Sequence, residues 1–344
     1  MLASVRALLS GVIDYAGMFP PAKLPLDQAI RNYARYRTEP ESWMLGRFIC
    51  PAERLEVLAP YLEELFLARP PLKISGLGRS GNTISTFRAN MCADLEMIAE
   101  FNDRSNHEKL ALVDVYEVRF PTEFIHSSKT LLEKIGILGL LLLEADRVLE
   151  KKTPAGFSMF FELPFNQDCP TTLAAFTQVL FGVKSTENRI RYFPSGVKIR
   201  CGGLEASAFP SPNQAANAIT SCRDTGVPLK ATAGLHHPIR HFNAELQTVM
   251  HGFLNVFVAG VLTFVNRLNE KEVQAIIENE DPKNFVFDEE GLRWKTYRAK
   301  TAQIEAARRE FITSFGSCSF DEPRDDLRAL GLIPPPHGNS GAQR

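Results

Sequence analysis

Two lysines lie in the middle of short strand-like runs in the second half of the chain. Lys198 is part of GVKIRC (residues 196–201), and Lys230 is part of PLKATA (residues 228–233). Side chains alternate across a strand, so Lys198 shares a face with Arg200, and Lys230 shares a face with Thr232. The apolar residues on the opposite faces must pack against helices, which turns the cations to the other side. An unpaired buried charge costs roughly several kcal/mol, so we expect a partner or a ligand there.

The first chemistry that such a lysine offers is nucleophilic. A second cation nearby and partial desolvation lower the pKa of a lysine, and the neutral amine then attacks a carbonyl group to form a Schiff base. This predicts Lys198 or Lys230 as the catalytic amine of a carbon–carbon lyase of the class I aldolase type.

The second chemistry is anion binding. Arg200 and a further arginine, Arg240, would hold a phosphate or carboxylate together with the lysines, and Thr232 faces the same side as Lys230. The glycine-containing turns 201–203 and 315–317 would add backbone N–H groups, which makes Gly202, Gly203 and Ser317 candidate substrate-binding residues. The same set suits a sugar isomerase or epimerase in which Glu162, His236 or His237 carries the proton.

A third interpretation is a divalent metal site. His236, His237 and His241, with Glu162, would bind an ion that polarises a sugar or a keto acid. However, Pro238 interrupts the helical spacing of His237 and His241, HExxH is absent, and three histidines within six residues fit poorly around one ion. We therefore expect no cofactor, with a divalent metal as the open alternative.

Strand-like and helical segments alternate along the chain, which is typical of a parallel α/β sheet. Eight βα units predict a (β/α)8 TIM-type barrel, whose active site lies at the carboxyl ends of the strands. A doubly wound open sheet would need a GxGxxG turn after an early strand, and none is present. The predicted strands are Trp43 to Cys50, Leu72 to Leu77, Leu110 to Phe120, Ile137 to Glu144, Phe157 to Leu163, Gly196 to Cys201, Leu229 to Ala233 and Phe311 to Ser317.

The chain is predicted to form one domain over residues 1–332, followed by a disordered tail at 333–344. An insertion at about 243–310 precedes the last strand and is expected to be largely helical, at 251–267, 270–278 and 295–311, with an extra strand at 284–288. The proline-rich segment 14–26 carries several large apolar residues, so we expect it to be irregular and to pack across one end of the barrel.

The charge balance excludes several classes of partner. Lysine and arginine total 39 against 40 acidic residues, so no global field attracts nucleic acid or an anionic membrane. The expected ligand is a small anionic substrate held by local charges, and a homo-oligomer is possible. No segment is apolar enough to span a bilayer, no leader peptide is recognisable and the six cysteines form no CxxC pair, which predicts a cytoplasmic protein.

The two lysine motifs resemble those of deoxyribose-phosphate aldolases, which carry lysines on two consecutive late barrel strands. The resemblance implies that Lys198 is the Schiff-base lysine and that Lys230 tunes it. The chain departs from that family after the first lysine, where Ile199, Arg200 and Cys201 replace small hydroxyl-bearing residues.

A broader resemblance covers nearly the whole chain. The stretches DYAGMFPPAKLPL, KIRCGGLEASAFPS, KATAGLHHPIRH, HGFLNV and SFGSCSFDEP are similar to those of a group of uncharacterised bacterial proteins. This resemblance implies a bacterial, cytosolic protein and no particular activity. The residues themselves favour a lyase or an isomerase acting on a small anionic carbonyl or sugar-like compound, with a noncatalytic ligand-binding barrel as the alternative.

Overall fold

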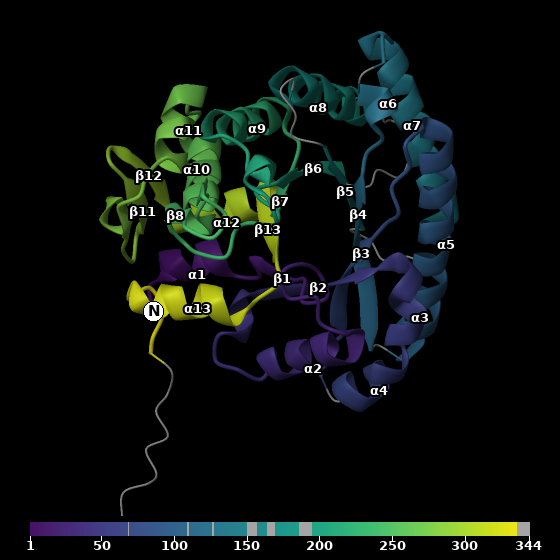
Figure 1. Ribbon diagram of the computed structural model, residues 1–344, viewed down its shortest axis with the longest axis horizontal. Helices are drawn as coiled ribbons and strands as arrows, with labels where there is room; N and C mark the ends of the chain where they lie inside the picture. The colour runs from purple at the N-terminus through teal and green to yellow at the C-terminus, as the bar shows by residue number, and fades with distance from the viewer. Residues whose placement is uncertain are drawn as a thin grey trace, which may run out of the picture.

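The computed structural model describes residues 1–67, 69–108, 110–125, 127–149, 157–163, 169–185 and 195–335. Its centre is a closed barrel of eight parallel strands ringed by helices (Figure 1). The barrel strands are β1 (Ile13–Tyr15), β2 (Leu45–Pro51), β3 (Leu72–Leu77), β4 (Ala111–Arg119), β5 (Ser158–Glu162), β6 (Ser195–Arg200), β7 (Leu229–Thr232) and β13 (Ile312–Ser317). They follow the chain order around the barrel, and β13 closes it against β1, so the predicted TIM-type α/β barrel is confirmed.

Helices cover the outside of the barrel and one of its ends. Figure 1 shows α5 and α7 along one side, α8 and α9 along the next, and α10 with α11 beyond them. The helices are α1 (Ala3–Leu9), α2 (Leu26–Tyr36), α3 (Leu55–Leu58), α4 (Pro60–Phe66), α5 (Ile84–Glu108), α6 (Thr122–Ile125), α7 (Leu131–Leu149), α8 (Cys169–Ser185), α9 (Pro212–Thr225), α10 (Phe253–Asn266), α11 (Glu270–Ile277), α12 (Thr301–Glu310) and α13 (Asp321–Ala329), with 3-10 turns at Ser42–Met44, Ala52–Arg54, Ala206–Ala208 and Pro282–Asn284.

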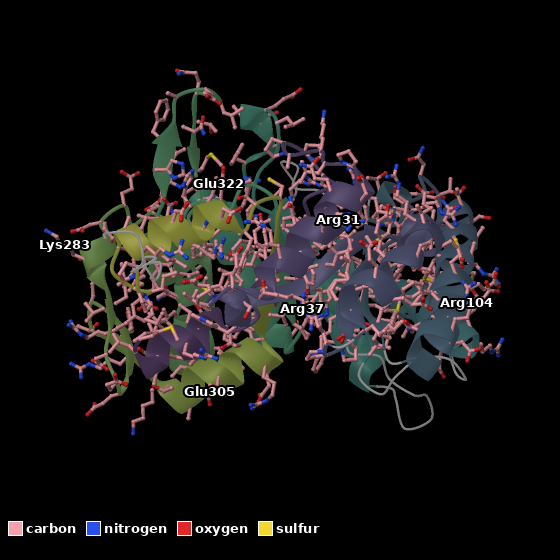
Figure 2. All side chains as sticks on the ribbon, turned by 90° about the horizontal axis from the view of Figure 1, so that it is seen from below. Arg31, Arg37, Arg104, Lys283, Glu305 and Glu322 are labelled. Carbon is pink, nitrogen blue, oxygen red and sulfur yellow. The ribbon has the colours of Figure 1, made fainter. Side chains whose placement is uncertain are left out.

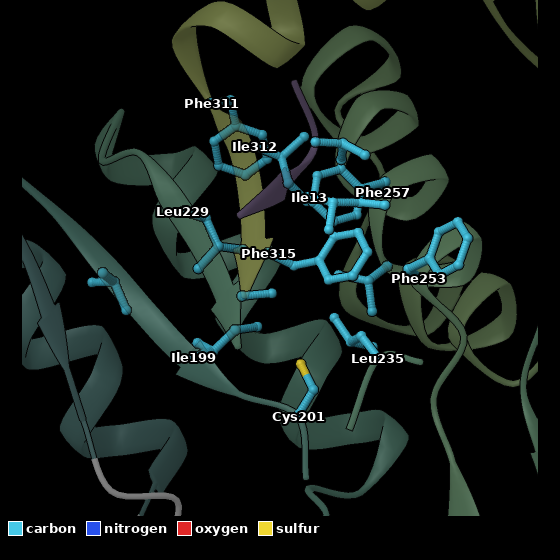
Figure 3. Packing of buried hydrophobic residues seen from close by; sticks show 14 of the residues in the cluster. Ile13, Ile199, Cys201, Leu229, Leu235, Phe253, Phe257, Phe311, Ile312 and Phe315 are labelled. Atoms are coloured by element: carbon cyan, nitrogen blue, oxygen red, sulfur yellow. The ribbon is translucent and has the colours of Figure 1, made fainter. Parts of the chain in front are cut away.

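The apolar faces of the late strands pack outward against α10 (Figure 3). Phe315 of β13 lies between two rings of that helix, with its ring centroid 5.3 Å from Phe253 and 5.6 Å from Phe257. Ile199 of β6 and Leu229 of β7 are buried in the same layer. The predicted alternation is therefore confirmed, because these apolar side chains leave the intervening polar ones to face the barrel axis.

One of the predicted strands is wrong, and one barrel strand was not predicted. The leucine-rich run Ile137 to Glu144 lies inside α7, where Leu138, Leu141 and Leu142 are buried at helical spacing. The missing eighth strand is instead β1, within a segment predicted to be irregular from Asp14 onward. It is only three residues long, so its pattern is too short to be recognised in the sequence.

The segment between β7 and β13 mixes helices with small sheets. Helices α10 and α11 confirm two of the predicted helices, and β10 (Phe285–Phe287) confirms the extra strand. The predicted helix 295–311 is wrong in its first part, because β12 (Tyr297–Lys300) precedes α12 and pairs with β11 (Gly291–Trp294). A second hairpin, β8 (His241–Asn243) with β9 (Thr248–Met250), opens the insertion.

Among the described residues, no helix combines the length and the apolar character needed to cross a bilayer. The predicted disordered tail lies outside the described residues from position 336 onward.

Candidate active site in the barrel interior

Lys198 and Lys230 lie side by side on β6 and β7, where their Cα atoms are direct partners in the parallel pairing. Both side chains are buried, with 5% and 1% of their surface exposed. Glu117 of β4 lies between the two ammonium groups: one carboxylate oxygen is 3.1 Å from Lys198 Nζ and the other is 2.6 Å from Lys230 Nζ. One buried carboxylate therefore links both lysines.

Each lysine also has a carboxylate of its own. Lys198 Nζ is 2.8 Å from Glu162 at the end of β5, and Lys230 Nζ contacts Asp14 of β1. Asp14 is held in turn by the Ser314 hydroxyl at 2.7 Å and by the Arg47 backbone N–H at 2.6 Å. The result is a continuous alternating row of charges across the interior, from Asp14 through Lys230, Glu117 and Lys198 to Glu162.

The contacts in this row favour the charged forms of Glu117, Glu162 and Lys198. Burial alone raises the pKa of Glu117, but Lys230 and Lys198 outweigh burial and hold that pKa well below its ordinary value. Burial also raises the pKa of Glu162, and Lys198 and Arg200 reverse the effect. Burial lowers the pKa of Lys198, yet Glu162 and Glu117 raise it above its ordinary value. For Lys198, the lowered pKa expected from the sequence is therefore not found while both carboxylates contact its ammonium group.

Glu162 connects the buried row to the surface. Its second oxygen lies 3.3 Å from Arg200 Nε, and the Arg200 side chain is 47% exposed whereas that of Lys198 is 5% exposed. Both Glu162 and Arg200 are the last residues of their strands, at the carboxyl ends where barrel enzymes bind substrates. The carboxylate of Glu162 therefore connects the buried Lys198 ammonium group to Arg200 at the carboxyl end of the barrel.

A β-bulge in β4 explains how Glu117 reaches the axis. Ile74 of β3 pairs with Val113, but the next residue, Ser75, pairs with Val115, so Asp114 is an extra residue. The bulge shifts the alternation by one position. Asp114 binds Arg47 with distances of 2.6 and 2.9 Å, while Glu117 accepts a 2.5 Å hydrogen bond from Ser75 Oγ. Glu117 therefore faces the axis, where its carboxylate lies between the two lysines.

The predicted glycine and hydroxyl residues have packing partners of their own. Gly202 lies so close to Gly234 that an added Cβ would be 2.7 Å from the Gly234 Cα atom. Gly234 itself has a φ of +70°, which explains its residue type, and the side of Gly203 on which a Cβ would sit faces Ala208. Ser317 Oγ donates to the Ser319 carbonyl at 2.7 Å, which fixes the turn after β13.

Thr232 lies on the inward face of β7, beyond Lys230. Its hydroxyl oxygen would be 2.9 Å from a Cβ added to Gly316, so the glycine leaves room for it beside the barrel axis. Thr232 is also the Cα partner of Arg200, at the carboxyl ends of the strands. The structure therefore brings Lys198, Lys230, Glu162, Arg200 and Thr232 to one side of the barrel wall.

The histidines after β7 turn toward α13. His236 Nδ1 is 3.0 Å from Glu322 and 4.0 Å from the Cys318 sulfur, and His237 Nδ1 is 2.6 Å from Asp326. Burial lowers the pKa of His236, but Cys318 and Glu322 outweigh it and raise that pKa to about 10. The structure pairs both predicted proton carriers with acids of α13, and neither has a recorded contact with the two lysines.

Arg240 is also engaged away from the lysines. Its Nε lies 3.6 Å from Glu280 and its Nη1 lies 3.4 Å from His251, while its backbone N–H donates to Asn255 at 2.9 Å. It therefore holds the loop after β7 to α10 and to the residues that follow α11.

The histidine cluster does not converge on one point. His237 and His241 meet edge to face, with ring centroids 4.5 Å apart, and His241 Nδ1 faces the Ile239 carbonyl. Within the described part of the chain, no group of three or more histidine, cysteine, aspartate or glutamate residues is arranged to hold a metal ion.

Comparisons with known proteins identify no family for this chain. No protein-family model matches the chain, and no curated protein matches it. A solved structure described as a "putative deoxyribose-phosphate aldolase" from Toxoplasma gondii ME49 is similar over 96% of this chain and 94% of that one, at 8% identity and a TM-score of 0.38. A likeness at this level carries no information about residues or activity.

Sequence reasoning missed part of the site. Asp14 was not recognised because β1 is so short, and Glu117 was obscured by the bulge in β4. Ser75, Ser314 and Arg47 were not singled out, because hydroxyls and an arginine near strand starts carry no special signal. Two buried cations need carboxylates as partners. The available clues to those partners were the short strand-like run that contains Asp14 and the acidic residues of β4.

Proposed function

We propose that this protein is an enzyme that forms a Schiff base between Lys198 and a small anionic carbonyl compound, in the manner of a class I aldolase. The observation that supports the proposal is the position of Lys198, a buried ammonium group with Glu162 at 2.8 Å, which itself contacts the half-exposed Arg200. Lys230 is enclosed by Asp14 and Glu117, which suits a positioning role.

The resting ion pair requires a proton transfer before the attack. Arg200 is one of the groups that lower the pKa of Glu162. A substrate anion that binds Arg200 draws this cation away, so the affinity of Glu162 for a proton rises. Glu162 then accepts a proton from Lys198, and the neutral amine becomes a nucleophile. The substrate charge thereby triggers formation of the nucleophile.

The remaining steps balance with these residues. The Lys198 nitrogen bonds to the carbonyl carbon, and Glu162 returns its proton to the carbonyl oxygen. Glu162 then carries one of the amine protons from the nitrogen to the same oxygen, which leaves as water, so that a protonated Schiff base and an ionised Glu162 remain. The carboxylate then accepts the hydroxyl proton of the β-carbon as the carbon–carbon bond breaks, and the bonding electrons enter the Schiff base as an enamine.

Reductive trapping tests the proposal. The full chain is treated with sodium borohydride in the presence of phosphorylated and carboxylated aldehydes and ketones, and the intact mass is measured. We expect one adduct per chain with at least one compound, and its loss in Lys198→Met. Lys271→Met, on the exposed surface, is the matched control. An adduct that persists in Lys198→Met, or a panel that gives no adduct, contradicts Schiff-base chemistry at Lys198.

A second candidate is an isomerase or epimerase that uses Glu162 as the base. It is favoured by the charged state of the pair, because an ionised Glu162 can remove a proton while the Lys198 ammonium group stabilises the resulting oxyanion. The discriminating result is exchange of substrate protons with deuterated solvent without a borohydride adduct. Saturable binding with neither exchange nor adduct indicates the noncatalytic ligand-binding alternative.

A further inference from the structure

A cavity of about 620 Å³ opens at the amino ends of the barrel strands, opposite the end that carries Arg200. Its wall includes the early residues of several strands, with Arg47 of β2, Ser158 of β5 and Thr313 of β13. Helices α1 and α12 close its sides, and Lys230 lies at its inner end. In Figure 2, Glu305 of α12, which lines the cavity, lies near the lower outline of the molecule, and Glu322 of α13 lies above it.

Cations outnumber acids in the lining of this cavity. Its lining carries five cations, Arg6, Arg47, Lys230, Arg308 and Arg309, and one acid, Glu305. Arg47 is neutralised by Asp114, and Lys230 by Asp14 and Glu117. The positive charge that remains comes mainly from the arginines of α1 and α12.

Arg308 is the central feature. Its guanidinium donates to the carbonyls of Ile312, Thr313 and Ser10, and its Nε is buried without a hydrogen-bond partner. In the described part of the chain, no carboxylate lies within ion-pair distance of it. Burial lowers its pKa, and Asp14 offsets this only in part. The Arg308 side chain is partly buried and has no counter-charge within that part of the chain, and an anion in the adjoining cavity would supply one.

The exposed arginines extend the same charge to the opening. Arg6 lies over the Trp43 ring, 4.8 Å from its centroid. Among the described residues, no carboxylate lies within ion-pair distance of Arg6. Arg309 pairs with Glu310 at the surface, with side chains 68% and 53% exposed, so solvent weakens that pair. Arginines with planar forks of N–H donors suit bidentate binding of phosphate and carboxylate groups.

We propose that this cavity is a second binding site, which takes a small, multiply charged anion bearing phosphate or several carboxylates. It lies at the opposite end of the barrel from Arg200, it shares only Lys230 with the charge row of the candidate active site, and it does not depend on Schiff-base chemistry at Lys198. Because Lys230 borders both the cavity and Glu117, the bound anion lies next to the charge row of the candidate active site.

Calorimetric titration of the full chain with sodium pyrophosphate, inorganic phosphate and citrate, at constant ionic strength, tests the site. We expect saturable binding of pyrophosphate or citrate, and whichever binds more tightly identifies the phosphate or the carboxylate class. The double variant Arg6→Gln/Arg309→Gln should weaken binding about tenfold or more, since it removes two charged donors. Both residues are at the cavity opening, so the fold should not depend on them.

Two controls separate this site from the other end of the barrel. Arg54→Gln removes an exposed arginine beyond the carboxyl end of β2, and Arg200→Gln removes the cation at the candidate active site. Neither should change the affinity by more than about twofold. Equal affinities in the wild type and the double variant, a loss of binding in Arg200→Gln, or no saturable binding of any of the three anions would overturn the proposal.

Discussion

Replacing Glu117 with glutamine removes the carboxylate that links the two buried lysines while keeping its shape. The change removes the negative charge that pairs with Lys230 at 2.6 Å and with Lys198 at 3.1 Å, and it leaves one acceptor oxygen in place of two. Breaking a buried ion pair costs about 3–5 kcal/mol. Each ammonium group keeps one carboxylate, Asp14 or Glu162, so we expect a loss near the lower limit, about 3 kcal/mol of unfolding free energy.

The same substitution should change reactivity in the opposite direction. Glu117 is one of the two carboxylates that raise the pKa of Lys198, so its removal lowers that pKa and increases the fraction of neutral amine. At pH 8, the rate of borohydride trapping per folded molecule should therefore rise while stability falls. A substitution that only damaged the fold would reduce both.

Urea unfolding at pH 7, followed by circular dichroism, measures the stability change. Glu64→Gln is the matched control, because Glu64 pairs with Arg31 at the surface, with side chains 51% and 49% exposed. Exposed pairs contribute about 0–1 kcal/mol. If Glu117→Gln costs no more than Glu64→Gln, Glu117 does not bridge the lysines and the arrangement of charges described above is wrong.

Three further predictions concern the buried acids, His236 and the packing of Phe315. The pKa values of Glu117 and Glu162 are lowered by folding, so their stabilisation is complete above about pH 4.3 and is lost as the pH falls; urea unfolding between pH 7 and 3 should show this loss, reduced in Glu117→Gln. Folding raises the pKa of His236 to about 10, so its protonated form stabilises the fold fully below about pH 6.5, and this contribution is lost as the pH rises through 10. NMR titration should find His236 protonated at pH 8 and its pKa lower in Glu322→Gln. A midpoint near pH 6.5 in the wild type would disprove the pairing. Phe315→Ala should cost about 3–5 kcal/mol in urea unfolding, because it leaves a cavity between β13 and α10, and a cost below 1 kcal/mol would contradict that packing.

The barrel could be predicted because its signal is repeated. Strands such as Leu229–Thr232 have a period-2 pattern and helices such as Glu270–Ile277 a period-3.6 pattern, and their alternation specifies a parallel barrel. The prediction of a strand at Ile137 to Glu144 is wrong because a short apolar run such as 137–143 fits either element. Strand β1 has only three residues, and what defines it is its pairing with β13 and β2, which is a tertiary property.

The sequence predicted the buried cations of the site but not the carboxylates that pair with them. The alternation of Lys198 with Val197 and Ile199 showed that a cation must face inward, and the same reasoning applied to Lys230. The carboxylates that compensate them come from β1 and β4, far away in the sequence, and the bulge at Asp114 changes which acids face the axis. The histidines after β7 were predicted as proton carriers because several lie close together in the sequence. Their partners Glu322 and Asp326 on α13 could be found only from the packing of that helix.

Peptide mapping of the borohydride-trapped protein tests the central claim most directly, since it reports which amine reacts. The full chain is exposed briefly to the carbonyl compound that gives an adduct, reduced, digested and sequenced by mass spectrometry. Lys198 should carry the modification, while Lys230 and exposed lysines such as Lys271 should remain unmodified. Modification of Lys230 alone, or of exposed lysines with Lys198 intact, would contradict the assignment of Lys198 as the reactive amine.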